Sequence, residues 1–248
     1  MIAVVHRASI VRLATCALLV PFGGLAAQEQ AAEVRQIVTF LFQPNRAAEA
    51  QTIYEQQLKP IYAAIPSLQR FRAYHEAESP EPLDLVVVSS YAGMAGMDSA
   101  NASLRRATWN GGPAVALYGV LSGISISHHD QFVEMLPALG DRAITAGGLT
   151  VFEYVRVVPG TQGAFEALLR SQVRPFEQEA GLYQWSETGR LLVSDGWDYL
   201  RVINIRSLGA WQSYRRRLRE APFADAWQRV IAAQKTLILR DDERLAIR

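Results

Sequence analysis

The sequence has 248 residues, of which 50% are hydrophobic, and its 25 Lys and Arg residues nearly balance its 24 Asp and Glu residues, leaving a net charge of +1. A chain of this composition can bury a substantial core, which excludes a largely disordered protein. A nucleic-acid-binding protein needs a concentrated basic surface, so the balanced charge argues against a nucleic-acid partner.

The N-terminal segment, residues 1–27, differs in kind from the rest. Arg7 and Arg12 precede an uncharged apolar run from Leu13 to Leu25, and small residues up to Ala27 lead into polar sequence. This order predicts a secretory signal peptide that is cleaved after Ala27. The run is shorter than the ~20 residues of a membrane-spanning helix, and an uncleaved anchor is the alternative. We therefore expect a periplasmic or secreted protein with no membrane span after cleavage.

Hydrophobic periodicity predicts four strands in the first half of the remaining chain, with helices between them. The first helix carries an apolar stripe at helical spacing and stops at Pro66. The stripe consists of Tyr54, Leu58, Ile61, Tyr62 and Ile65. Asn110-Gly111-Gly112-Pro113 interrupts the second helix, and a further helical stretch follows. The predicted strands are 34–42, 68–76, 84–91 and 123–127, and the predicted helices are 54–65 and 94–109.

The same order of elements returns after Gly147-Gly148. Gly181 is placed to end the first helix of this half, and Asp195-Gly196 predicts a turn between the two middle strands. The predicted strands are 149–158, 182–187, 198–206 and 236–240, and the predicted helices are 165–176 and 211–231.

The two halves also match in register. Asp84 corresponds to Asp198, about 114 residues later, and Lys59-Pro60-Ile61 corresponds to Arg174-Pro175-Phe176 at nearly the same spacing. Matches spread over several elements in nearly one register indicate an internal duplication, because one matched pair alone could arise by chance.

A unit of the order β-α-β-β-α-β folds as a four-stranded antiparallel sheet with two helices on one face. Its bare face is buried when a second sheet packs against it. The sequence therefore predicts an α+β fold, in which two tandem ferredoxin-like βαββαβ repeats pack sheet to sheet as a fused dimeric α+β barrel. The first repeat is placed at 34–132, a linker at 133–148 and the second repeat at 149–245.

Three motifs of the second half carry a family resemblance. Val155–Gly160 ends a strand with Pro-Gly before a helix, Trp197–Val202 forms the third strand, and Leu218–Phe223 lies in the closing helix. With these motifs the chain resembles the dimeric α+β barrel superfamily, and within it the NIPSNAP and antibiotic-biosynthesis-monooxygenase-like proteins. The resemblance covers most of the second repeat and, more faintly, the first. It implies a fold and leaves the reaction open, because unrelated activities share such barrels.

Three histidines follow the predicted signal peptide: His75, His128 and His129. They lie near the ends of the second and fourth strands, where they could form a proton-transfer pair or bind a metal or haem. Those two strands are opposite edges of the predicted sheet, and adjacent residues of a strand point to opposite faces. Solvated histidines at strand ends are therefore the competing interpretation.

Aromatic residues on several strands suggest a ligand site between the two sheets, with Phe40 and Tyr154 interpreted as equivalent positions of the repeats. If that space is open, it forms an apolar pocket edged by a few polar groups, which suits a small aromatic or lipid-like molecule. The alternative is that these side chains fill the core. The ligand-binding candidates are His75, His128, Tyr74, Phe40, Tyr154, Glu153, Trp185 and Tyr199.

No catalytic signature is present: the sequence lacks Gly-x-Ser-x-Gly, Gly-x-Gly-x-x-Gly and His-Glu-x-x-His motifs. Asp241-Asp242-Glu243 is interpreted as a solvated tail. We expect an exported NIPSNAP-like barrel that binds a small apolar ligand or serves as a structural protein. The alternatives are a cofactor-independent monooxygenase acting on an aromatic substrate and a haem-binding protein. No metal site and no cofactor are predicted, and fusion of two copies neither requires nor forbids a homo-oligomer.

Overall fold

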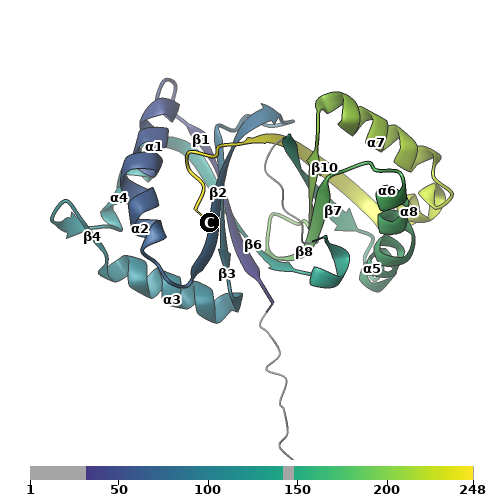
Figure 1. Ribbon diagram of the computed structural model, residues 1–248, viewed down its shortest axis with the longest axis horizontal. Coiled ribbons are helices and arrows are strands. Elements are labelled where there is room, and N and C mark those ends of the chain that lie inside the picture. The colour runs from purple at the N-terminus through teal and green to yellow at the C-terminus, as the bar shows by residue number, and fades with distance from the viewer. Residues whose placement is uncertain (1–31, 142–147, 248) are drawn as a thin grey trace, which may run out of the picture. The chain divides into compact units, whose positions relative to one another are not determined.

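The computed structural model describes residues 32–141 and 148–247 (Figure 1). The predicted signal peptide lies outside the described residues, so export stays a prediction. Within the described part of the chain, no helix is both long enough and apolar enough to cross a membrane.

Eight antiparallel strands close into a barrel in the order β1-β3-β2-β10-β7-β9-β8-β6. The strands of the first half run in the order β6-β1-β3-β2, and those of the second half run in the order β10-β7-β9-β8. The two sheets therefore face each other as predicted, and they are also hydrogen-bonded edge to edge, β2 to β10 and β6 to β8. The strands are β1 (Val34–Phe42), β2 (Leu68–Glu78), β3 (Leu85–Tyr91), β6 (Ser125–Met135), β7 (Leu149–Val157), β8 (Trp185–Val193), β9 (Tyr199–Ile205) and β10 (Ile231–Asp241).

Helices cover the outside of the barrel, those of each half lying on the sheet of their own half (Figure 1). In the first half they are α1 (Ala47–Ile53), the π-helical turn η1 (Tyr54–Leu58), α2 (Lys59–Ala63), α3 (Gly93–Arg106) and α4 (Ala116–Ile124). In the second half they are α5 (Gln162–Leu168), the π-helical turn η3 (Leu169–Val173), α6 (Arg174–Glu179), α7 (Leu208–Glu220) and α8 (Ala224–Val230). A short 3-10 turn, η2 (Pro137–Leu139), lies between the halves, and the expected interruption after α3 is a small hairpin of β4 (Thr108–Trp109) and β5 (Gly112–Pro113).

The middle of the barrel is packed. Tyr74 and Trp185, two of the predicted ligand-binding residues, are buried in it, and the Tyr74 ring meets Phe152 at a centroid distance of 5.6 Å. Leu200, Val202 and their neighbours complete this core. The sequence left open whether the space between the sheets is a pocket or a packed core, and the middle of that space is a packed core.

Asp84 and Asp198 occupy corresponding places in the two halves. The Asp84 carboxylate accepts from the Phe42 backbone N–H at 2.7 Å, and the Asp198 carboxylate accepts from that of Val157 at 2.8 Å. Each therefore fixes the start of the third strand of its half to the end of the first strand. The same side chain making the same bond in both halves gives a physical reason for the matched register.

The π-helical turns η1 and η3 precede Pro60 and Pro175, another matched pair. A proline ring clashes with the carbonyl four residues before it and donates no N–H, so it disturbs the regular ladder. The chain widens its turn instead: the Lys59 N–H bonds to the Tyr54 carbonyl and that of Arg174 to the Leu169 carbonyl, each five residues back.

The last strand of each half is longer than predicted. β6 and β10 each have 11 residues, whereas the periodicity predicted 123–127 and 236–240. In β6, residues 128–130 are polar and exposed, which hides the alternation that marks a strand. The predicted helix at 211–231 is broken at Ala221-Pro222-Phe223, because Pro222 cannot continue the ladder of α7.

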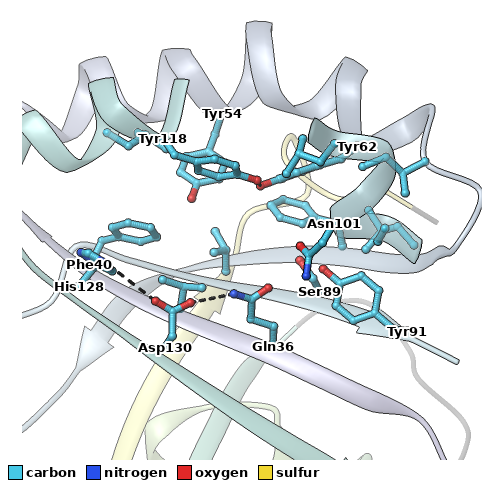
Figure 2. A pocket seen from close by; sticks show the side chains of 18 of the residues that line it. Gln36, Phe40, Tyr54, Tyr62, Ser89, Tyr91, Asn101, Tyr118, His128 and Asp130 are labelled. Atoms are coloured by element: carbon cyan, nitrogen blue, oxygen red, sulfur yellow. Dashed lines mark hydrogen bonds and ion pairs between the residues drawn. The ribbon is translucent and has the colours of Figure 1, made fainter. Parts of the chain in front are cut away.

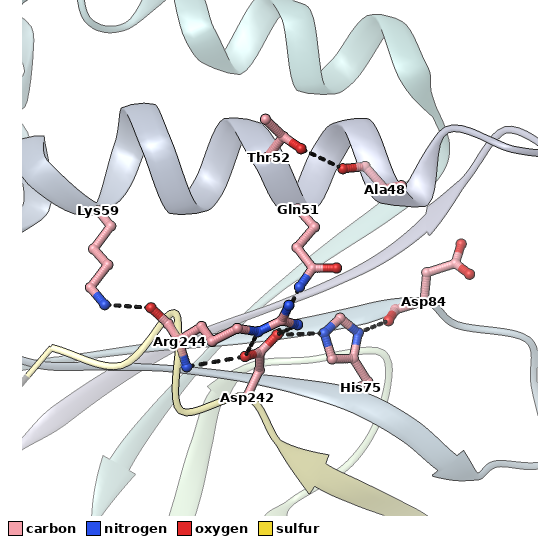
Figure 3. A network of polar contacts seen from close by, with 8 residues as sticks. All are labelled: Ala48, Gln51, Thr52, Lys59, His75, Asp84, Asp242 and Arg244. Atoms are coloured by element: carbon pink, nitrogen blue, oxygen red, sulfur yellow. Dashed lines mark hydrogen bonds and ion pairs between the residues drawn. The ribbon is translucent and has the colours of Figure 1, made fainter.

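The C-terminal segment is not the solvated tail that its charges suggested. Asp242 is only 5% exposed and Leu245 is fully buried, and the backbones of Ile247 and Phe71 exchange two hydrogen bonds. The Asp242 carboxylate accepts from His75 Nε2 at 2.9 Å and from Gln51 and Arg244 (Figure 3). A buried carboxylate is tolerated when hydrogen bonds satisfy it, and here they fasten the end of the chain to the first half.

Candidate functional site

A cavity of about 510 Å³ lies on the outer face of the first sheet, beneath the helices of that half. We call it the helix–sheet pocket. Alternate side chains of β1, Gln36, Val38 and Phe40, point into it. The remaining lining residues are Tyr54, Tyr62, Ile65, Leu68, Phe71, Val87, Ser89, Tyr91, Ala100, Asn101, Leu104, Tyr118, Gly119, Leu121, Ser122, His128 and Asp130.

The sheet side of this pocket carries a line of polar groups. The pairing of β1 with β6 sets Phe40 opposite His128 and Val38 opposite Asp130. His128 Nε2 lies 3.8 Å from Asp130 Oδ2, and Asp130 Oδ1 accepts from Gln36 Nε2 at 2.8 Å (Figure 2). The His128 ring stacks on Phe40 with centroids 6.0 Å apart. An imidazole held beside a carboxylate can accept a proton, because the carboxylate stabilises the resulting positive charge.

The helix side carries tyrosine hydroxyls. Tyr54 comes from η1, Tyr62 from α2 and Tyr118 from α4, and the hydroxyls of Tyr62 and Tyr118 are hydrogen-bonded to each other (Figure 2). Burial raises the pKa of Tyr118 to about 12, and burial followed by the neighbouring Tyr118 raises the pKa of Tyr54 and of Tyr62 above the usual value. These phenols stay protonated at neutral pH and can donate to an oxygen atom of a ligand.

The charge of the pocket is small. Among the described residues that line it, Asp130 is the acidic one, and none is Lys or Arg. Apolar side chains such as Phe71, Leu104 and Leu121 make up much of the remaining wall. Such a pocket suits an uncharged, ring-containing molecule with one or two oxygen atoms.

Of the eight predicted ligand-binding residues, the structure brings Phe40 and His128 together in this pocket. His75 lies outside it, with Nδ1 3.0 Å from the Asp84 carbonyl oxygen and Nε2 on Asp242. Adjacent His128 and His129 face opposite sides of β6, as predicted, because His129 lines a different cavity.

The other predicted residues lie elsewhere. Tyr74 and Trp185 are in the barrel core, and Tyr154 also points into the barrel, where its hydroxyl donates to Gln131 at 2.8 Å. Glu153 and Tyr199 lie under the helices of the second half: Glu153 pairs with Arg201 at 2.9 Å, and the Tyr199 hydroxyl donates to Glu166 at 2.7 Å.

The equivalence of Phe40 and Tyr154 was wrong by one residue. Phe40 packs against the helices and Tyr154 packs inside the barrel. The residue in the place of Phe40 is Val155, since the Asp84 N–H bonds to the Phe40 carbonyl and the Asp198 N–H bonds to the Val155 carbonyl. A slip of one residue moves a strand side chain to the other face of the sheet.

The sequence did not single out Tyr54, Tyr62, Tyr118, Gln36 or Asp130. Tyr54 and Tyr62 were predicted only as members of the apolar stripe of the helix at 54–65. The presence of two tyrosines in an otherwise aliphatic stripe could have indicated a polar site beneath this helix, because a buried tyrosine hydroxyl needs a hydrogen-bond partner.

The corresponding region of the second half is filled by large side chains. Arg201 is 1% exposed, pairs with Glu153 and with Glu177 at 2.7 Å, and lies 5.6 Å from the centre of the Trp227 ring. Trp211 and Tyr214 stack beside this cluster with centroids 4.9 Å apart. The two halves therefore differ between sheet and helices, where the first half holds a pocket and the second half is filled.

No family model matches the sequence, and no curated protein matches it. Solved structures do match. A candidate monooxygenase from Fusobacterium nucleatum superposes with a TM-score of 0.62 at 10% identity, covering 85% of this chain and 93% of that one. An anthrone oxidase-like protein gives 0.57 at 15% identity, with 87% and 93% covered. A haem-binding protein from Thermus thermophilus gives 0.54 at 12% identity, with 86% and 92% covered.

The chain shares with these proteins the fold of a closed eight-stranded α+β barrel. At these identities the likeness concerns the fold alone, since one fold hosts many unrelated reactions.

The residues of the helix–sheet pocket do not fit haem. A haem site needs an axial ligand and groups that can face the propionate carboxylates. The imidazole of His128 stacks on Phe40 and faces Asp130, and the described lining holds no Lys or Arg to pair with a propionate. Within residues 32–141 and 148–247, no group of three or more His, Cys, Asp and Glu side chains is arranged to hold a metal ion.

Proposed function

We propose that the helix–sheet pocket binds a small, uncharged, planar aromatic molecule bearing hydroxyl or carbonyl groups, and that the protein oxygenates this molecule without a cofactor. One observation carries the proposal: in a largely apolar cavity, the hydroxyls of Tyr62 and Tyr118 face a wall that holds the His128–Asp130 pair (Figure 2). The fold shared with an anthrone oxidase-like protein and a candidate monooxygenase supports it.

His128 acts as the base in this proposal. It takes a proton from a phenol or from a methylene group next to a carbonyl, and Asp130 stabilises the imidazolium that forms. Of the hydroxyls of Tyr62 and Tyr118, the one that accepts in their mutual hydrogen bond keeps its own hydrogen free and donates to the substrate oxygen on which negative charge develops. The electron-rich anion then reduces dioxygen. In a methylene substrate, the methylene carbon exchanges two hydrogens for one oxygen atom, and the second oxygen atom leaves as water with those two hydrogens. In a phenol, the oxygenated ring carbon and the hydroxyl each lose one hydrogen, so the products are a quinone and water.

The molecule that carries this site is proposed to be a fused pair of ferredoxin-like repeats. The strand orders β6-β1-β3-β2 and β10-β7-β9-β8 support the duplication, and so do the equivalent bonds of Asp84 and Asp198. Export through the predicted signal peptide, a NIPSNAP-like role and association into a homo-oligomer stay predictions.

The proposal is tested by oxygen uptake. The purified protein is incubated with a panel of hydroxylated anthrones and naphthols in the presence of a metal chelator, and dissolved oxygen is followed with an electrode. His128→Ala is expected to lower kcat/KM by about 10²–10⁴-fold, the usual contribution of a general base.

Ile126→Ala is the matched control, because Ile126 lies two residues before His128 on β6, is 60% exposed and is not part of the pocket lining. Its activity should equal that of the unaltered protein. Equal uptake by His128→Ala would remove the base from the mechanism. Tight binding with no uptake would identify a binding protein in place of an oxygenase.

The haem alternative has its own measurement. Titration with haem should give no saturable shift of the Soret band. A shift that His128→Ala abolishes would overturn the conclusion that the pocket residues do not fit haem.

A further inference from the structure

A second cavity, of about 530 Å³, lies on the opposite side of β1 and β6 from the helix–sheet pocket. Inward-facing side chains of the barrel strands, including Tyr154 and Arg156, line it together with residues 81–83 between β2 and β3 and the β8–β9 turn. We call it the barrel-mouth pocket. Nothing in the proposed oxygenation uses it.

Arg156 is the distinctive group of this pocket. Its guanidinium lies over the Trp197 ring, 5.2 Å from the centroid, and its Nε donates to the Gly196 carbonyl. Among the described residues, no carboxylate lies within ion-pair distance of Arg156 and its terminal nitrogens have no acceptor. The other cation of the lining, Lys235, is already paired with Glu81. Arg156 is therefore a positioned positive charge whose two terminal nitrogens can still donate.

Gln131 adds a neutral donor at the buried side of the pocket. It is 9% exposed, and its side-chain carbonyl accepts from the Tyr154 hydroxyl at 2.8 Å. This bond leaves the amide nitrogen as the free end of the side chain. The acidic groups of the lining are at the outer rim, where the side chains of Glu81 and Asp195 are 69% and 78% exposed.

We propose that the barrel-mouth pocket is a second binding site, which takes a small organic carboxylate. The carboxylate accepts from the terminal nitrogens of Arg156 and from the amide of Gln131, and its apolar part lies against Trp197 and Leu237. A planar guanidinium matches the two oxygens of a carboxylate, which favours this ligand over a neutral one. The helix–sheet pocket disfavours the same ligand, because its charged lining residue, Asp130, is an anion.

The test is titration of the full-length protein with benzoate and with hexanoate, followed by calorimetry and by the indole N–H signals in NMR spectra. Saturable binding that shifts the Trp197 indole signal is expected, with much weaker binding of benzyl alcohol. Arg156→Gln should weaken benzoate binding by about tenfold or more, the effect of losing a hydrogen bond to a charged group. Arg206→Gln, which removes an exposed arginine outside the pocket, should leave it unchanged.

Because Arg156→Gln could alter the turn that Arg156 contacts, Thr39→Asp is the second variant. It places a negative charge in the same lining and leaves the turn untouched, and it should also abolish benzoate binding. Absence of saturable binding of either carboxylate overturns the proposal. It is equally overturned if both variants bind benzoate as the unaltered protein does, or if Arg206→Gln weakens binding as much as Arg156→Gln.

Discussion

At the scale of single residues, a tyrosine hydroxyl contributes differently in the two halves. In the helix–sheet pocket, the paired hydroxyls of Tyr62 and Tyr118 are positioned to meet a ligand. In the second half, the Tyr183 hydroxyl donates to Asp141 at 2.8 Å. Both bonds contribute to stability, and in our account only the first pair also contributes to turnover.

Tyr118→Phe separates these contributions. It should lower the free energy of unfolding by about 1 kcal/mol, the usual net value of one hydrogen bond. It should also lower kcat/KM by about 10²-fold, because a donor to the developing oxyanion is lost. Denaturant unfolding and steady-state kinetics measure the two effects. Tyr183→Phe is the control, with a similar loss of stability and unchanged kinetics. Unchanged kinetics in Tyr118→Phe would show that the hydroxyl pair is structural.

Asp242 makes the anchoring of the C-terminal segment depend on pH. Burial alone would raise the pKa of Asp242, but the hydrogen bonds from Arg244 and His75 outweigh burial and lower the pKa below its usual value. A carboxylate with a lowered pKa stabilises the folded state above its unfolded pKa of about 3.9, and this contribution is lost as the pH falls through the lower, folded value.

Hydrogen exchange of the Phe71 and Ile247 amides, which pair with each other's carbonyls, should therefore be slow from neutral pH down to about pH 4 and should gain a component of segment opening below it. Asp242→Asn should show faster exchange at neutral pH and no added opening in acid. A protection profile that is the same in both proteins would mean that Asp242 does not hold the segment.

At the scale of elements, η1 sets the position of Tyr54 relative to Tyr62. The widened turn exists because Pro60 follows it, and Pro175 imposes the same turn in the second half. Tyr54 lines the pocket, whereas the second turn packs into a filled core. The same π-helical turn therefore contributes a residue to a pocket in the first half only.

Pro60→Ala restores a backbone donor and allows a regular turn, which would move Tyr54 away from its place in the wall. Calorimetry with a naphthol should show affinity reduced by roughly tenfold, equivalent to about 1.4 kcal/mol. Pro175→Ala makes the same backbone change in the second half and should leave affinity unchanged. An equal effect of both substitutions would indicate a general loss of stability in place of a specific change in the pocket.

The sequence predicted the elements where hydrophobic periodicity was strong. β1, β3, β7 and β9 and the interruption after α3 were found in this way, because their faces are uniformly buried or their breakers are Gly and Pro. β6 was predicted too short because its polar residues face cavities on both sides. Polar side chains that line a cavity therefore interrupt the alternation of polar and apolar residues from which a strand is predicted.

At the scale of the whole molecule, the closed barrel decides which candidates meet. We predicted a ligand between the sheets, but the middle of that space is packed with residues such as Tyr74 and Trp185. The helix–sheet pocket instead forms on the outer face, where Phe40 and His128 converge with tyrosines from three helical segments. Their convergence depends on where the helices lie on the sheet and on the register of the strands. Hydrophobic periodicity predicts neither.

The asymmetry of the halves follows from what fills the helix layer. The first half leaves a cavity beneath its helices, and the second half fills the same layer with Arg201 and its two carboxylate partners together with tryptophan rings. Two halves of one chain can differ in this way, whereas the subunits of a homodimer share one sequence. The confinement of His75, His128 and His129 to the first half was the sequence signal of this division.

The most direct measurement of the central claim is a crystal structure of the protein grown anaerobically with a hydroxylated anthrone. We expect the planar ligand in the helix–sheet pocket, with an oxygen atom within hydrogen-bond distance of Tyr62 or Tyr118 and a reactive carbon facing His128. A ligand bound inside the barrel, or in the helix layer of the second half, would contradict it.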